Sequence, residues 1–155
     1  MMRVTMHNQP GLLKQAAIWH GQEAMRAESV AFGVIDKHGH LHAVITIDNH
    51  QAYSCDMHIA TNNKKRWATR RVLEAIARYV FEHLNLIKIK TTIPHWNLRA
   101  QALVLHLGFV AEGYTKCGAH DGSDGVYFGM TRDECPWLKR GEVEPKEQQN
   151  GQQSS

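Results

Sequence analysis

The order of apolar patterns in the second half of the chain constrains its fold more than any other feature of the sequence. Alternating residues over Tyr53–Thr61 predict a strand, and apolar residues at helical spacing predict an amphipathic helix over Lys65–Leu84. A strand over Leu86–Ile93 and a helix over Leu98–Leu107 follow. Two strands that are joined through a helix need a crossover connection, so part of the sheet is predicted to be parallel.

Strand-like patterns with good turn chemistry flank this central unit. Outside this unit the sequence predicts one further helix, over Leu12–Ala27. It also predicts strands over Val4–His7, Ser29–Asp36, His40–Ile47, Phe109–Lys116 and Val126–Thr131. The sequence therefore predicts an α/β fold. Its mixed central sheet is mostly antiparallel, has one parallel β-α-β crossover and is flanked by helices.

Length and composition fit a single domain, which we place at residues 1–140 of the 155. The polar residues 141–155 cannot bury a core, so this tail is predicted to be disordered. Apolar residues make up 43% of the chain, which excludes a disordered protein, and no run approaches the ~20 apolar residues of a membrane span. The start lacks the apolar stretch of a secretion signal, and three widely spaced cysteines predict no disulfide framework. Both features indicate the cytoplasm.

The distribution of charge is more informative than its sum. A formal net charge of +3 is too small to predict a nucleic-acid partner. Five cations nevertheless fall within eight positions, at Lys64, Lys65, Arg66, Arg70 and Arg71. A strand that runs into a helix N-terminus presents unpaired N–H groups and a positive dipole end, so this junction predicts a phosphate site. The alternatives are a solvated basic helix end and a nucleic-acid surface, although no stacking aromatic platform accompanies the cations.

Three stretches resemble the GCN5-related N-acetyltransferases (GNATs). Asn63–Leu73 is similar to the acetyl-CoA loop of the family, whose pattern is Gln/Arg-x-x-Gly-x-Gly/Ala. Asn97–Ala100 is similar to the Asn-x-x-Ser helix start, and Leu107–Gly113 to the Leu-Gly-Phe-x-x-Glu-Gly strand. The resemblance covers residues 29–134 and leans toward the Rim-like branch that acetylates ribosomal-protein N-termini.

The chain departs from the family pattern at several positions. Lys64 and Arg66 stand where the loop usually has small residues or glycine, and only Ala68 keeps the small final residue. Lysine and arginine can still offer their backbone N–H groups if φ stays negative. Ala100 replaces a serine of this branch, and Val104 stands where other branches carry a tyrosine acid. One helix precedes the first hairpin, where the family has two, so we expect an open acceptor pocket.

The resemblance implies acetyl transfer from acetyl-CoA to an amine. The expected cofactor-binding residues are Ile59, Ala60, Thr61, Asn63, Lys64, Lys65, Arg66, Trp67, Ala68, Thr69 and Asn97. Backbone near Ile59 and Ala60 would supply the hydrogen-bond donor for the developing oxyanion. No metal site is expected, because the histidines of His38–His42 lie along a strand too straight to surround one ion.

The candidate catalytic groups lie close to the same strand end. His58 is the preferred base, directly or through a water, and Asp56 shares its strand face and would orient it. The competing interpretation is that both are solvent-facing residues of a half-exposed strand. Asn97 would hold the pantetheine arm or the thiol, and it also suits a helix N-cap. The candidates for the general acid are Tyr114, Cys117 and His106, and Tyr114 is the one that we include among the candidate catalytic residues.

The sequence thus predicts an acetyltransferase with an amine acceptor as its partner. A protein N-terminus is slightly favoured over a small-molecule or lysine amine, because the resemblance leans to the branch that acetylates ribosomal-protein N-termini. An α-amino group with a pKa near 8 also needs less help from a base than a lysine amine near 10.4. Two other functions stay open. One is a GNAT-fold protein that binds CoA or a protein partner without turnover, and the other is a basic nucleic-acid-binding module. A homodimer is also left open.

Overall fold

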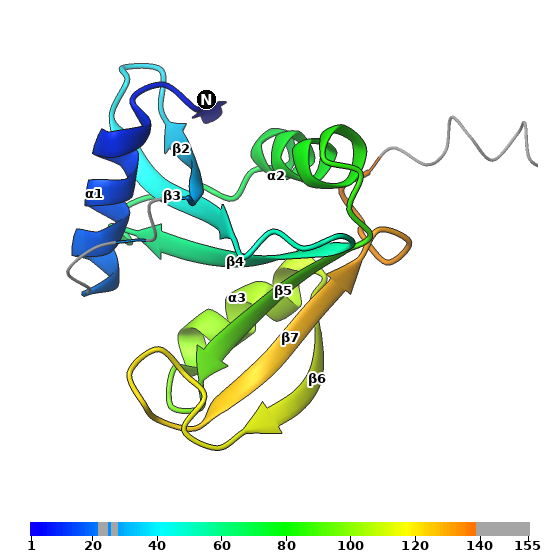
Figure 1. The fold of residues 1–155 in the computed structure, drawn as a ribbon. Helices are drawn as coiled ribbons and strands as arrows, with labels where there is room; N and C mark the ends of the chain where they lie inside the picture. The colour runs from blue at the N-terminus through cyan, green and yellow to red at the C-terminus, as the bar shows by residue number, and fades with distance from the viewer. Residues whose placement is uncertain (22–24, 26–27, 139–155) are drawn as a thin grey trace, which may run out of the picture.

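The computed structural model describes residues 1–21, 25 and 28–138 of the chain. Seven strands form one sheet in the order β1-β2-β3-β4-β5-β7-β6 (Figure 1). The elements are β1 (Arg3–Thr5), α1 (Gln9–His20), β2 (Val30–Ile35), β3 (Leu41–Asp48), β4 (Ser54–Thr61), α2 (Arg70–Arg78), the π-helical turn η1 (Tyr79–His83), β5 (Lys88–Pro94), α3 (Leu98–Leu107), β6 (Val110–Thr115) and β7 (Gly125–Thr131). The predicted tail 141–155 lies outside the described residues.

The predicted mixed sheet is confirmed. All neighbouring strands pair antiparallel except β4 and β5, which are parallel and joined through α2. The parallel pairing covers only three residue pairs, from Ser54 with Lys88 to Asp56 with Lys90. Both strands continue past these pairs and diverge, so the sheet opens into two halves (Figure 1). We call the space between the diverging strands the gap.

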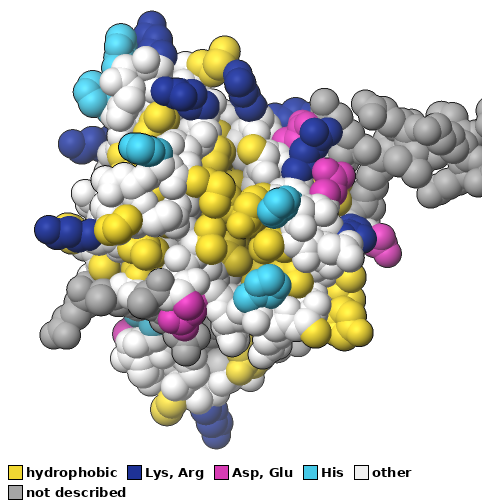
Figure 2. Space-filling view, turned by 45° about the horizontal axis from the view of Figure 1, so that its top comes forward, with side chains coloured by type: hydrophobic (Ala, Val, Ile, Leu, Met, Phe, Trp, Pro, Cys, Tyr) yellow, Lys and Arg dark blue, Asp and Glu magenta, His cyan; other side chains and the backbone are white. Residues whose placement is uncertain are grey.

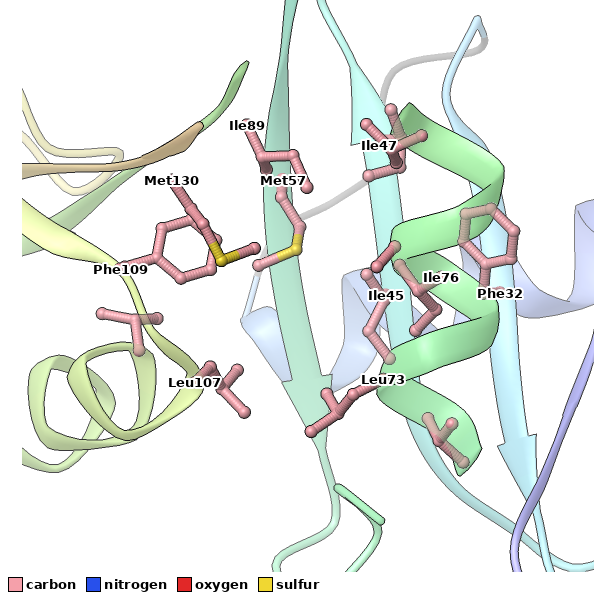
Figure 3. Close-up of a cluster of buried hydrophobic side chains, with 14 of the residues drawn as sticks. Phe32, Ile45, Ile47, Met57, Leu73, Ile76, Ile89, Leu107, Phe109 and Met130 are labelled. Carbon is pink, nitrogen blue, oxygen red and sulfur yellow. The ribbon is translucent and has the colours of Figure 1, made fainter. Parts of the chain in front are cut away.

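Helices cover the two faces of the first half of the sheet. On one face, α1 packs Leu12 and Ala16 against small residues of β2, β3 and β4, including Ala60. On the other face, α2 packs Leu73 and Ile76 onto the sheet, within a larger buried cluster that also reaches α3 and β7 (Figure 3). The alternation of β4 explains this arrangement, because successive side chains of a strand point to opposite faces. No helix among the described residues is long and apolar enough to cross a membrane.

The first helix begins earlier than its apolar pattern predicted. The helix was predicted to begin at Leu12, but it begins at Gln9, because the side chain of Asn8 caps it by accepting the N–H of Gly11. Pro10 falls in the first turn, where its missing N–H costs nothing. The helix then ends at Gly21, which has a φ of 71°. The rest of the prediction, as far as residue 27, falls largely outside the described residues.

The second helix begins five residues later than predicted. The sequence placed its start at Lys65, whereas α2 begins at Arg70 after Thr69, whose hydroxyl accepts the N–H of Val72. Threonine is a favourable N-cap, and it fixes the helix start more strongly than the basic residues before it. As a result, Lys64, Lys65 and Arg66 lie in a loop rather than in the first helical turn.

Candidate active site

Beyond its short pairing with β5, strand β4 directs backbone groups into the gap. The N–H of Asn62 donates to a carbonyl of β3, whereas the carbonyl of Tyr53 accepts two N–H groups from the chain entering β5. Backbone groups alternate in direction along a strand, so the odd-numbered positions of β4 face away from β3. Met57, Ile59 and Thr61 therefore point their N–H and C=O groups to the side that β5 has left.

An apolar hollow lies beside the gap, and both halves of the sheet form its walls. Figure 3 shows the side chains of Met57 and Met130 pointing toward each other from the two halves. Figure 2 shows hydrophobic side chains gathered across the middle of this side of the molecule. The lining residues are Ile45, Met57, Ile59, Trp67, Leu73, Ile76, Ala77, Ile89, Leu107, Phe109 and Met130. Trp67, a predicted cofactor contact, is thus a buried wall of this hollow.

The loop between β4 and α2, residues 62–69, offers unused backbone donors; we call it the basic loop. Asn63 has a φ of 58°, a conformation that asparagine tolerates, and its N–H donates to Thr61 Oγ1. The N–H of Lys64 donates to Asn62 Oδ1. Of residues 64–69 none has a positive φ, so lysine and arginine replace the usual glycines without strain. The next four N–H groups make no hydrogen bond to the described part of the chain: Lys65, Arg66, Trp67 and Ala68.

Four exposed cationic residues lie in or directly after the basic loop that carries these N–H groups. Lys64, Lys65 and Arg66 are exposed in the basic loop, and Arg70 is exposed at the start of α2. None of these four forms an ion pair with a carboxylate of the described residues. The positive end of the α2 dipole points the same way. The features on which the predicted anion site rests, backbone donors and cations, therefore lie in the loop before the helix rather than in its first turn.

Three histidines meet on the opposite face of the sheet, where α1 ends; we call them the imidazole cluster. The ring of His20, the last residue of α1, lies 6.0 Å from the ring of His58 on β4 and 5.4 Å from that of His120, which belongs to the β6–β7 connection. Burial, with His58 and His120 close by, lowers the pKa of His20 to about 4. The cluster joins the two halves of the sheet across the gap.

The carboxylate beside His58 is not the one that the sequence predicted. Asp48, the last residue of β3, places Oδ1 3.5 Å from His58 Nε2. Asp56 instead accepts a hydrogen bond from the side chain of Asn49 at 3.0 Å and pairs with Lys90 at 3.7 Å. Asp56 and His58 do share a face of β4, but the predicted role of Asp56 as the residue that orients His58 is not supported by these contacts.

Asn97 has the N-cap position that the sequence predicted, and Tyr114 lies on an outermost strand of the sheet. Asn97 caps α3, with Oδ1 accepting the N–H of Ala100 at 3.1 Å, and its side chain is half-buried. Tyr114 lies on the edge strand β6, which β5 and β7 separate from β4. Its hydroxyl donates to Asp124 at 2.6 Å, and this hydrogen bond raises the tyrosine pKa. Two strands thus lie between β4 and Tyr114 in the sheet, and the hydroxyl proton of Tyr114 is engaged by Asp124.

Sequence reasoning missed Asp48, His20 and His120. Asp48 falls just after the strand predicted over His40–Ile47. The two histidines lie at the end of a helix and in a polar turn, where local patterns give no signal that they meet. Helix length holds the one usable clue, since Gly21 is a strong helix stop and would have put His20 at the end of α1. The remaining predicted residues, Ala60 and Thr69, serve as a helix contact and as a helix cap.

The fold of the chain is similar to that of several solved acetyltransferases. A spermidine N-acetyltransferase, SpeG, from Vibrio cholerae matches with a TM-score of 0.69 at 15% identity, covering 85% of this chain and 94% of its own. Ribosomal-protein-S5-alanine acetyltransferase from Vibrio fischeri matches with 0.66 at 15% identity, covering 86% and 94%. A GNAT-family acetyltransferase from Bacillus anthracis matches with 0.58 at 22% identity, covering 67% of each chain. No family model and no curated protein sequence matches the chain. The chain thus has the GNAT fold, as the resemblance predicted.

Proposed function

We propose that the protein is an N-acetyltransferase that moves an acetyl group from acetyl-CoA to an amine. One observation carries the proposal: pairing between β4 and β5 stops after three residue pairs, and the gap connects the basic loop with the imidazole cluster. A sheet that opens in this way provides backbone donors, an apolar wall and a polar face at one point. The GNAT fold of the chain agrees with this assignment.

The residues beside the gap fit acetyl-CoA. The four unused N–H groups of the basic loop suit a diphosphate, and the side chains of Lys65 and Arg66 add charge-assisted hydrogen bonds. The outward backbone of Met57 and Ile59 suits the amide groups of the pantetheine arm, beside an apolar wall. Bound there, the cofactor supplies an acetyl thioester to the amine.

The chemistry requires a neutral amine and a stabilised oxyanion. His58 is the proposed base, because its side chain is one-third exposed on β4, next to the gap. The N–H of Ile59, which faces the gap, is the proposed donor to the oxyanion. A thiolate with a pKa near 8.5 is a good leaving group, so a strong general acid is less necessary.

A protein N-terminus remains the favoured acceptor. An α-amino group is about half neutral near pH 8, so a single imidazole can complete its deprotonation. SpeG acts on spermidine and the Vibrio fischeri enzyme on a ribosomal protein, so neighbours of the same fold do not select between the two acceptor classes. A reducing compartment suits the three widely spaced cysteines of the chain.

Calorimetry and thiol release test the proposal in two steps. Acetyl-CoA is expected to bind the protein, and Arg66→Glu to weaken the binding more than tenfold, because it reverses a charge beside the phosphates. Lys14→Glu is the matched control, since Lys14 is exposed on α1, on the opposite face of the sheet from α2. An unchanged dissociation constant for Arg66→Glu would remove the basic loop from the site.

Turnover distinguishes an enzyme from a protein that only binds CoA. The second function has one observation in its favour, since Ala100 and the buried Val104 replace side chains that the family uses near the thiol. Thiol release from acetyl-CoA is measured with a peptide carrying a free N-terminus, the same peptide with a blocked N-terminus and a lysine, and spermidine. Release with the first alone would support the favoured acceptor, and binding without release would support the second function.

A further inference from the structure

Asp48 is a buried carboxylate to which the proposed chemistry assigns no role. Its side chain is 5% exposed, and the ion pair that it forms within the described residues is with His58, at 3.5 Å between Oδ1 and Nε2. Burying a carboxylate is costly unless a partner compensates for the lost water. The buried carboxylate of Asp48 nevertheless lies directly beside His58, the proposed base.

The register of β3 and β4 fixes this contact. Thr46 lies opposite His58, and Asp48 lies opposite Asp56. Asp48 and His58 are therefore diagonal neighbours on the same face of the sheet, within reach of each other. Asp56, the residue that faces Asp48, is turned to Lys90 and Asn49, which leaves Asp48 for the imidazole.

The contact determines which nitrogen of His58 can act. A carboxylate accepts hydrogen bonds and donates none, so it favours the tautomer that carries the proton on Nε2. The lone pair is then on Nδ1. His20 packs against the same ring without contributing a charge at neutral pH, since its own pKa is about 4.

We propose that Asp48 is the positioning residue for His58: it holds the proton on Nε2 so that Nδ1 can take the proton from the acceptor amine. This inference rests on the proposed function. An ammonium group transfers one proton to Nδ1, and the negative charge of Asp48 stabilises the imidazolium that forms. The neutral amine then attacks the thioester carbonyl, a C–N bond forms and the C–S bond breaks. The nitrogen loses its extra proton to the departing thiolate through solvent, which leaves an amide and a thiol. His58 returns its proton to solvent.

A double-mutant cycle with Asp48→Asn and His58→Gln tests this role. Asparagine keeps the shape of the buried side chain, so folding can be retained, and thermal unfolding checks that it is. We expect Asp48→Asn to lower kcat/KM for the amine at least tenfold and to leave the KM for acetyl-CoA within twofold. In the His58→Gln background the same change is expected to cost less than twofold, because Asp48 acts through His58. Equal losses in both backgrounds would show a merely structural role and overturn the proposal.

Asp56→Asn identifies which carboxylate acts. The same cycle is run with Asp56→Asn in place of Asp48→Asn. If the loss caused by Asp56→Asn disappears in the His58→Gln background and the loss caused by Asp48→Asn does not, Asp56 is the positioning residue and the proposal is wrong. A coupling found for Asp48 alone supports it.

Imidazole nitrogen NMR gives a readout that does not depend on activity. Spectra of the wild-type protein at pH 8, with the His58 signals identified by their loss in His58→Gln, are expected to show the proton on Nε2. A proton on Nδ1 would overturn the inference. Absence of thiol release by the wild-type protein with every amine would instead refute the proposed function, so the two failures are distinguishable.

Discussion

Replacement of His20 is expected to make the stability of the protein less sensitive to acid. The side chain ends α1 inside the imidazole cluster, and its Nε2 is buried without a hydrogen-bond partner among the described residues. Burial first, and then the nearby His58 and His120, lower its pKa from 6.5 to about 4. Between about pH 4 and pH 6.5, His20 is therefore mostly neutral in the folded protein and mostly protonated in the unfolded chain.

The sign and size of the effect follow from this difference in pKa. As the pH falls through 6.5, the unfolded state binds a proton at this position, and the folded state does not until about pH 4. Stability contributed by neutral His20 is thus complete above pH 6.5 and is lost as the pH falls toward 4. Between pH 7 and pH 5 the loss is about 2 kcal/mol, which corresponds to a decrease in Tm of about 4–8 °C for a chain of this size.

The assay compares the free energy of urea unfolding at pH 7 and pH 5 for wild type and His20→Gln. Glutamine does not titrate, so the variant is expected to lose about 2 kcal/mol less than wild type between the two pH values. His106→Gln is the matched control, since His106 is exposed on α3 and is expected to leave the pH dependence unchanged. Parallel pH curves for wild type and His20→Gln would refute the reasoning, because another group would then carry the acid sensitivity.

Three further changes test the frame around the site. Thr69→Ala removes the cap of α2 and is expected to cost about 1 kcal/mol in urea unfolding; no loss would mean that the helix does not depend on this hydroxyl. Trp67→Ala empties a wall of the apolar hollow and is expected to cost about 3–5 kcal/mol, and a loss below about 1 kcal/mol would contradict its burial. Gly108→Ala places a side chain at a φ of 106° and against Pro136, so Tm is expected to fall; an unchanged Tm would contradict the conformation of this turn.

Much of the fold could be predicted because each element carries its own signal. The apolar stripe of α2 and the alternation of β4 are local patterns, and the crossover between β4 and β5 follows from their order. Helix boundaries were less predictable. In both α1 and α2 one side-chain cap determines where the helix begins. Because Thr69 is the N-cap of α2, that helix begins after the basic residues, and because Asn8 is the N-cap of α1, that helix begins at Gln9. The basic loop kept its predicted donors but lost its predicted helical geometry.

The candidate site shows where local patterns stop being informative. Alternation correctly places Asp56 and His58 on one face of β4, but two residues on that face are about 7 Å apart along the strand. A closer neighbour has to come from the adjacent strand, and its identity depends on the register between β3 and β4. That register is set by the connection 49–53, whose sequence specifies a turn but not the pairing that results. A shift of this pairing by two residues that placed Asp48 opposite Ser54 would keep every side chain on its predicted face and yet remove Asp48 from His58. The chemistry of the face could thus be predicted from the sequence, and the partner of the base could not.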